Sequence, residues 1–157
     1  MTTSLLFFGA LGVISTAFAF AANRRLFARG TGGMSALEGA YFLIGLASLG
    51  LGWYFNVRYT HQYGHQANDV NSTKALFSNW AADSAAQDYI SVTVLLFPLW
   101  SITDGRRRGM RFPWIFFVMS LFTSLAFSVA VYLAFVERQI RYNRVEPADS
   151  ITSYPQL

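Results

Sequence analysis

Long apolar segments separated by short charged clusters dominate the chain. An α-helix needs about 20 residues to cross the roughly 30 Å hydrocarbon core of a bilayer. Four segments approach this length, and they predict membrane-spanning helices at about residues 4–23, 38–57, 84–103 and 112–136. The last segment is the clearest, because 25 uncharged residues lie between Arg111 and Glu137. The pattern therefore predicts an all-α fold, a four-helix transmembrane bundle.

Residues at the ends of these segments support the predicted boundaries. Ser35, followed three residues later by Glu38, fits a capping box at the start of the second helix. Pro98 lies inside the third helix, where the missing N–H is expected to kink it and free a carbonyl near Val94. We expect a single four-span membrane domain over residues 1–144, with a polar loop between the second and third helices. A polar C-terminal tail covers residues 145–157.

Composition excludes the other broad classes of protein. Hydrophobic residues make up 54% of the 157 residues and charged residues only 13%, against about 25% charged in an average soluble domain. Disorder needs low hydrophobicity and many charges, so it is excluded for most of the chain. The sequence holds no cysteine, which excludes disulfides and cysteine-based metal sites.

The distribution of Lys and Arg predicts the orientation, because cytoplasmic loops of membrane proteins are enriched in these residues. In a four-span topology, one side carries seven of them, in the two short Arg-rich turns. The other side carries five, which are Arg58, Lys74, Arg138, Arg141 and Arg144. This small excess predicts cytoplasmic turns, and both termini outside the cytoplasm.

Small residues at spacings of three and four form stripes on three of the predicted helices. The stripes consist of Gly9, Gly12, Thr16 and Ala19, of Gly45, Ser48 and Gly52, and of Ser120, Ser124 and Ser128. Such stripes let helix backbones approach closely in lipid. They are expected to pack within this chain, or to dock onto the helices of a partner.

Charged residues near the predicted membrane surfaces are the other candidates for function. Arg106, Arg107, Arg108 and Arg111 follow the third helix, and we expect them to contact lipid headgroups or an acidic cytoplasmic surface. Asp88 is the one acidic residue expected at membrane depth, in the first turn of the third helix. An ionisable residue there is a functional candidate, although the helix dipole would also stabilise a carboxylate in a first turn.

No catalytic set or cofactor motif is present. The predicted spans offer hydroxyls without a nearby base, and phosphate-loop and dinucleotide motifs are missing. His61 and His65 stand four residues apart, but only Asp69 could act as a third ligand nearby. We therefore expect no enzymatic activity, no cofactor and no bound metal.

Several motifs together resemble a family of small bacterial membrane proteins of unknown function. They are Asp88, the turn Asp104-Gly105-Arg106-Arg107-Arg108-Gly109-Met110, Trp114 and the closing pair Glu137-Arg138. The resemblance covers about residues 45 to 142 and implies a location in the bacterial inner membrane. Here the last helix lacks the Gly and Pro often found in its middle, and the first helix is an addition. A narrower resemblance, in size, helix number and lack of cysteine, is to LucB-type accessory subunits of mycobacterial Mce1 lipid importers.

These observations favour a non-catalytic accessory membrane subunit. The small-residue stripes exceed what four helices can bury, which suggests a larger complex. The narrower resemblance implies an MCE-type ABC importer of lipids such as fatty acids, with this chain beside its transmembrane permease subunits. The expected partners are therefore membrane lipids and this permease, without nucleic acid. Two alternatives remain: a small autonomous transporter or proton-coupled carrier using Asp88, and a small subunit of a respiratory complex.

Overall fold

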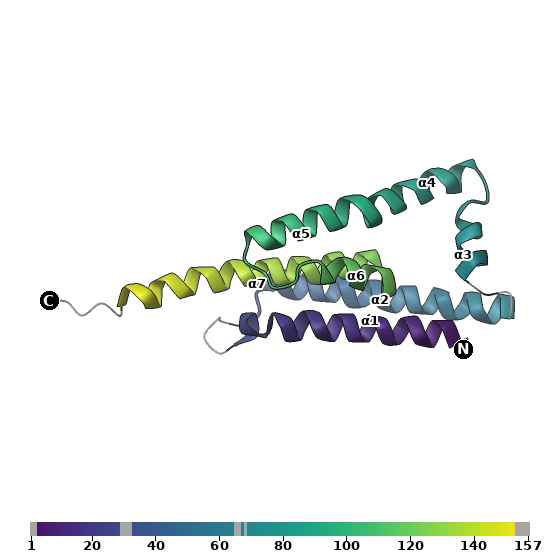
Figure 1. Cartoon of the computed structure of the whole chain (residues 1–157). Coiled ribbons are helices and arrows are strands. Elements are labelled where there is room, and N and C mark those ends of the chain that lie inside the picture. Colours follow the sequence, from purple (N-terminus) through teal and green to yellow (C-terminus); the bar gives the residue numbers. More distant parts are fainter. Residues whose placement is uncertain (1–2, 29–32, 65–66, 68, 153–157) are drawn as a thin grey trace.

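The computed structural model describes residues 3–28, 33–64, 67 and 69–152, and every regular element within them is helical (Figure 1). In chain order these elements are α1 (Thr3–Ala22), η1 (Arg24–Phe27), α2 (Ala36–Tyr63), α3 (Asp69–Leu76), α4 (Trp80–Ile90), η3 (Ser91–Leu96), α5 (Phe97–Arg107), α6 (Ile115–Phe122) and α7 (Leu125–Thr152). The prediction of an all-α fold is confirmed for this part of the chain.

Three of the predicted helices are present, and the second and third are longer than expected. The first is α1, the second is α2, and the third is the continuous run of α4, η3 and α5. The capping box that opens α2 is confirmed, with Ser35 and Glu38 each bonding the other's backbone N–H. The third helix widens into a π-helical turn at Ser91–Leu96, directly before Pro98. Proline cannot donate to the Val94 carbonyl, and the wider turn accommodates that missing bond.

The expected single helix over residues 112–136 is wrong. Helix α6 ends at Phe122, Thr123 leaves helical geometry with φ −118° and ψ −95°, and α7 begins at Leu125. In Figure 1, α7 turns back along α6 and continues to the C-terminal end of the chain. The fourth apolar segment is therefore a helical hairpin of α6 and the first half of α7, and its two ends lie at the same end of the bundle.

Aromatic contacts between its two arms hold the hairpin closed. The ring of Phe116 in α6 lies 5.2 Å from that of Tyr132 and 5.3 Å from that of Phe135, both in α7. In one straight helix, residues 116 and 135 would lie about 28 Å apart. Side chains also bond the backbone at the bend. The Thr123 hydroxyl donates to the Met119 carbonyl at 2.7 Å, and the Phe127 N–H donates to Ser124 Oγ at 3.1 Å.

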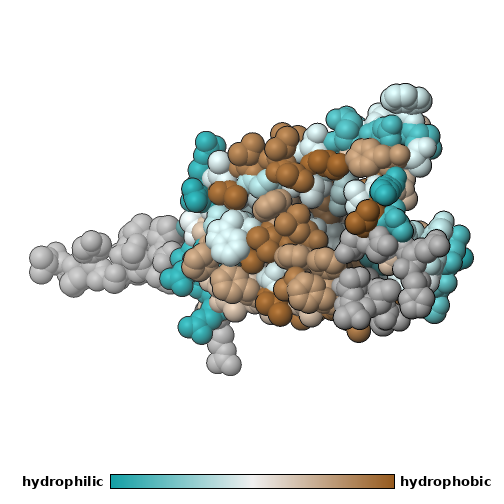
Figure 2. Space-filling view, turned by 45° about the vertical axis from the view of Figure 1, so that its right-hand side comes forward, coloured by the Kyte–Doolittle hydropathy of each residue, from teal (hydrophilic) through white to brown (hydrophobic). Residues whose placement is uncertain are grey.

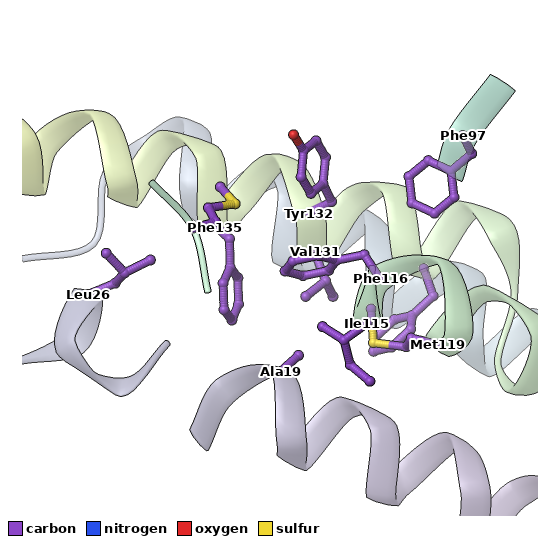
Figure 3. Packing of buried hydrophobic residues seen from close by; sticks show 11 residues of the cluster. Ala19, Leu26, Phe97, Ile115, Phe116, Met119, Val131, Tyr132 and Phe135 are labelled. Atoms are coloured by element: carbon purple, nitrogen blue, oxygen red, sulfur yellow. The ribbon is translucent and has the colours of Figure 1, made fainter. Parts of the chain in front are cut away.

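The hairpin occupies the centre of the molecule. Its side chains meet Ala19 of α1, Leu26 of η1 and Phe97 of α5 in one buried cluster (Figure 3). Helix α2 packs along α7, where Gly45 faces Phe127 and Ala130. The apolar residues of the fourth segment therefore form the core of this chain rather than a lipid-facing surface.

Gly12 provides the space that the hairpin bend needs. A Cβ at this position would lie 2.9 Å from the carbonyl oxygen of Phe122 and 2.9 Å from Cγ2 of Thr123. We expect Gly12→Ala to lower the free energy of unfolding by about 1–3 kcal/mol, as overpacking usually does. Thermal unfolding in detergent measures this change. The matched control is Gly50→Ala, because no atom lies within 4 Å of that Cβ. The control is expected to be neutral or to stabilise by up to about 1 kcal/mol, and equal losses in both variants would contradict this packing.

Two helices are long and apolar enough to cross a membrane by length and composition. They are Ala36–Tyr63, which is α2, and Trp80–Arg107, which combines α4, η3 and α5. Leu6–Ala22 is a shorter apolar helix. Figure 2 shows apolar side chains gathered in the middle of one face, with hydrophilic side chains at either end. This is the surface pattern of a protein whose central part contacts lipid.

Candidate functional site

Basic side chains gather at the end of the bundle where the hairpin begins and returns. Of the eleven Lys and Arg residues that the structure describes, nine lie at this end. They are Arg24, Arg25, Arg106, Arg107, Arg108, Arg111, Arg138, Arg141 and Arg144. We call this the cationic end. Among the side chains that the structure describes, three carboxylates accompany them there, Glu38, Asp104 and Glu137, so these side chains have a positive excess.

Glu38 is the centre of a buried ion cluster at the cationic end. Its side chain is 1% exposed, and its Oε1 lies 2.6 Å from Nε of Arg138. Its other carboxylate oxygen accepts a bond from Arg141. A buried carboxylate is tolerated when cations and hydrogen bonds surround it. Two arginines of α7 are therefore fixed to the first turn of α2.

The same arginines also bind the segment that precedes α2. Arg138 donates to the Leu26 carbonyl at 3.3 Å, and its guanidinium lies 4.5 Å from the ring centre of Phe27. Arg141 donates to the Gly33 carbonyl. A four-span topology would put Arg138 and Arg141 on the opposite side of the membrane from Glu38. That placement is wrong because the hairpin returns α7 to the cationic end.

Asp104 forms a second cluster between α5 and α7. Its Oδ2 lies 2.7 Å from Nε of Arg108 and accepts a bond from the Tyr132 hydroxyl at 2.6 Å. The hydrogen bond to Asp104 raises the pKa of Arg108 above its usual value. Arg108 is therefore paired with this carboxylate. Arg106 and Arg107 are exposed and form no ion pair within the described residues.

Two glycines allow the Arg-rich turn to adopt its backbone conformation and its close packing. Gly105 leaves room for Pro113, since a Cβ on Gly105 would lie 2.5 Å from Cβ of Pro113. Gly109 has φ +75°, a conformation that other residues adopt only with strain. The N–H of Met110 donates to the Gly105 carbonyl at 2.9 Å, which closes the turn.

Asn23 attaches this turn to the end of α1. Its amide oxygen accepts the Arg111 N–H at 3.0 Å, and its Nδ2 donates to the Arg111 carbonyl at 3.1 Å. Asn23 is fully buried. Nothing local in the sequence around Asn23 indicates a partner 88 residues away.

The predicted stripe on α1 is used inside the chain. A Cβ on Gly9 would meet Trp53 of α2 at 2.8 Å, and Gly12 faces the hairpin bend. The Thr16 hydroxyl bonds the Gly12 carbonyl at 2.8 Å, and Ala19 is fully buried. This stripe brings α1 close to both α2 and α6.

The other two stripes differ in their surroundings. Gly45 packs against α7, whereas Ser48 is half-buried and no atom lies within 4 Å of a Cβ on Gly52. Ser120 and Ser124 form local bonds to the backbone of the hairpin. The Ser128 hydroxyl is buried without a hydrogen-bond partner among the described residues. Gly52 thus leaves part of the α2 surface free for close approach by another helix.

Asp88 does not lie in the first turn of its helix. The helix opens at Trp80 with Asn79 as its cap, so Asp88 lies more than two turns later. Helix α4, which carries it, lies far from the cationic end (Figure 1). The side chain is exposed and accepts a bond from the neighbouring Gln87. The helix dipole therefore does not explain this residue.

The proposed histidine pair cannot be assessed as a unit, since His65 lies outside the described residues. His61 is exposed on the last turn of α2. Among the described residues, no group of three or more His, Cys, Asp or Glu side chains could hold a metal ion.

Tyr132 links the hairpin to the Arg-rich turn through one hydroxyl. We expect Tyr132→Phe to lower the free energy of unfolding by about 1.5–3 kcal/mol, because it removes a hydrogen bond to a charged group. Chemical denaturation in detergent measures this change. Tyr54→Phe is the control, because its hydroxyl bonds Arg58 at an exposed position. A loss for Tyr132→Phe no larger than for the control would show that the Asp104 bond contributes nothing.

Comparison with known proteins identifies a family but no relative of known activity. A family described as protein of unknown function DUF2834 matches residues 40–138, from the first turns of α2 to Arg138 in α7. Neither a curated protein nor a solved structure matches the chain. The narrower resemblance to Mce1 accessory subunits therefore has no support from these comparisons.

Proposed function

Because the chain belongs to the DUF2834 family of unknown function, we propose a function from its geometry: a non-catalytic integral membrane subunit of a larger complex. In this proposal α1, α2 and the α4–η3–α5 helix cross the bilayer. The hairpin enters from the cationic end and returns to it. The observation that carries the proposal is the broad exposure of apolar side chains on helices of spanning length.

This exposure is greatest on α2. Of the 18 consecutive residues that are most apolar in α2, only 6% are buried. In the corresponding stretch of the third helix, 22% are buried. Leu43 is 70% exposed and Leu99 64% exposed. A soluble protein rarely exposes so large a continuous apolar surface, whereas lipid tails solvate it readily.

The hairpin is compatible with a bilayer because its bend is half-buried, packs on α1 and has backbone groups bonded by its own side chains. Non-helical backbone at membrane depth is tolerated only where it is buried in protein or lines a cavity. Here Gly12 of α1 contacts the bend directly, and the Thr123 and Ser124 hydroxyls bond backbone groups beside it. A re-entrant hairpin rather than a fourth span therefore fits the described geometry.

The positive-inside rule then gives a clearer orientation than the four-span topology. Three crossings and a re-entrant hairpin place nine of the eleven described basic residues on one side, which we assign to the cytoplasm. The N-terminus lies outside and the C-terminus inside. The location of the C-terminus is the opposite of that expected from four spans.

The proposed partner is the transmembrane permease of an MCE-type lipid importer, as the narrower resemblance implies. The open surface of α2 around Gly52 supports docking of another helix, because small residues allow close helix contact in lipid. The same exposed surface would also serve a subunit of a respiratory complex, so the identity of the partner decides between them.

Crosslinking in native membranes, followed by purification of the tagged chain in mild detergent, tests this proposal. We expect a larger multi-span permease to co-purify. Gly52→Leu should lower its recovery without affecting folding, whereas Leu95→Phe, on the exposed face of η3, should not. Recovery of the chain alone would contradict the accessory role, and recovery of respiratory subunits would replace the lipid importer as partner. Transport by the reconstituted chain alone, abolished by Asp88→Asn, would instead support the carrier alternative.

A further inference from the structure

An apolar groove lies between the third helix and the hairpin. It has a volume of about 290 Å³ and is lined by Val92, Leu96, Phe97, Trp100 and Val129. Three of these side chains remain open to the surroundings, Val92 at 40%, Leu96 at 60% and Trp100 at 44% exposure. The groove is therefore accessible from the surface that we assign to the bilayer.

The geometry of the third helix creates this groove. The helix contacts α7 closely at Tyr132, whose ring lies 5.0 Å from that of Trp100 and 6.3 Å from that of Phe97. From there toward α4 the helix diverges from α2 and α7 (Figure 1). The π-helical turn at Ser91–Leu96 lies in this diverging part. The groove thus begins beside Tyr132 and follows the opening between the two elements.

An unpaired cation lies beyond the end of the groove, on the same helix. Val92, Leu96 and Trp100 recur every four residues on one helix face, and Asp104 and Arg108 continue that face. Arg108 is bound to Asp104, but the adjacent Arg107 is exposed and forms no ion pair within the described residues. Arg107 lies seven residues, or about 10 Å, beyond Trp100 along the helix. An apolar groove with a free guanidinium about 10 Å beyond its end on the same helix complements a ligand with a hydrocarbon chain and an anionic head.

We propose that this groove binds one anionic phospholipid, with an acyl chain along Val92–Trp100 and its phosphate at Arg107. The positive excess of the cationic end favours an anionic headgroup over a zwitterionic one. This inference rests on the proposed membrane insertion, and it adds a specific lipid site to that function.

Quenching of Trp100 fluorescence by brominated lipids tests the site. The full chain, carrying Trp53→Phe, Trp80→Phe and Trp114→Phe, is reconstituted into phosphatidylcholine vesicles with a minor fraction of brominated phosphatidylglycerol or brominated phosphatidylcholine. We expect the apparent affinity for the anionic lipid to be about fivefold higher, as one arginine near the surface provides. Equal quenching by the two lipids would overturn the proposal.

Two matched pairs of variants separate a site from general attraction. Arg107→Gln should abolish the preference, whereas Arg106→Gln, on the face of Ile102 and Leu99, should retain it. Val129→Phe fills the groove and should reduce quenching by both lipids, whereas Leu95→Phe should not. Equal effects within either pair would overturn the site. Flotation of the protein with the vesicles after alkaline washing reports insertion separately, so failure to float would count against the proposed function instead.

Discussion

Glu38→Gln is expected to lower the free energy of unfolding by about 3–5 kcal/mol, the usual cost of removing one partner from a buried ion cluster. The substitution leaves the guanidinium groups of Arg138 and Arg141, whose side chains are 11% and 20% exposed, without the carboxylate that neutralises them. It also weakens the attachment of α7 to the first turn of α2. Denaturation in detergent, monitored by circular dichroism, measures the loss.

Glu137→Gln is the matched control for this prediction. Glu137 is a carboxylate of α7 at the same end, but it is 25% exposed and lies 3.9 Å from Arg141. Its replacement is expected to cost less than about 1 kcal/mol. If the two variants lose the same amount of stability, Glu38 does not occupy the buried position described here.

Phe135→Ala is expected to cost about 3–5 kcal/mol, the range for removing a large buried aromatic side chain. Phe135 is 0% exposed, and its ring lies 4.9 Å from Phe20, 5.3 Å from Phe27 and 5.3 Å from Phe116. The cavity left by the ring would remove packing contacts that α1, η1 and both arms of the hairpin share. The loss should appear in the same denaturation experiment.

Phe55→Ala is the matched control, because it makes the same replacement at a position on α2 that is 63% exposed. Its side chain faces the surface assigned to lipid, so its removal is expected to leave the fold largely intact. A straight helix over residues 112–136 would not bring Phe116 and Phe135 together. In that fold, Phe135 would not contact Phe116, and replacing Phe135 would cost less stability. If Phe135→Ala lowers the stability as little as Phe55→Ala does, the hairpin is contradicted.

Three helices could be predicted from the sequence because each depends on local properties. Apolar length identified α1, α2 and the third helix, and the capping box of Ser35 and Glu38 located the start of α2. The turn around Gly109 was likewise expected, and its positive φ explains why glycine is present. Local backbone preferences thus account for these parts of the fold.

The hairpin could not be predicted because its cause is tertiary. Hydropathy measures the length of an apolar segment but not its path, and residues 112–136 are long enough for one span. The bend depends on the close approach of Gly12, more than a hundred residues earlier, to Phe122 and Thr123. The adjacent Thr123 and Ser124 and the basic residues after Glu137 were available signals, but neither is specific to a bend.

The candidate site was predicted only in part for the same reason. Arg106, Arg107, Arg108 and Arg111 were expected to follow the third helix, but Arg106 and Arg107 lie in the last turn of α5, Arg108 caps it, and Arg111 comes after it. Arg138 and Arg141 were assigned to the other side, since a continuous helix would have carried them there. Their contacts with Glu38, Leu26 and Gly33 connect residues about a hundred positions apart, which no local pattern reveals.

The most direct test of the re-entrant hairpin is the side of the membrane on which α7 emerges. Because the chain has no cysteine, single variants Ala28→Cys, Gln62→Cys and Asn143→Cys can be labelled with a membrane-impermeant maleimide in intact and in disrupted cells. We predict that Gln62→Cys is labelled in intact cells, whereas Ala28→Cys and Asn143→Cys are labelled only after disruption. Labelling of Asn143→Cys together with Gln62→Cys in intact cells would show that residues 112–136 cross the membrane, and would contradict this account.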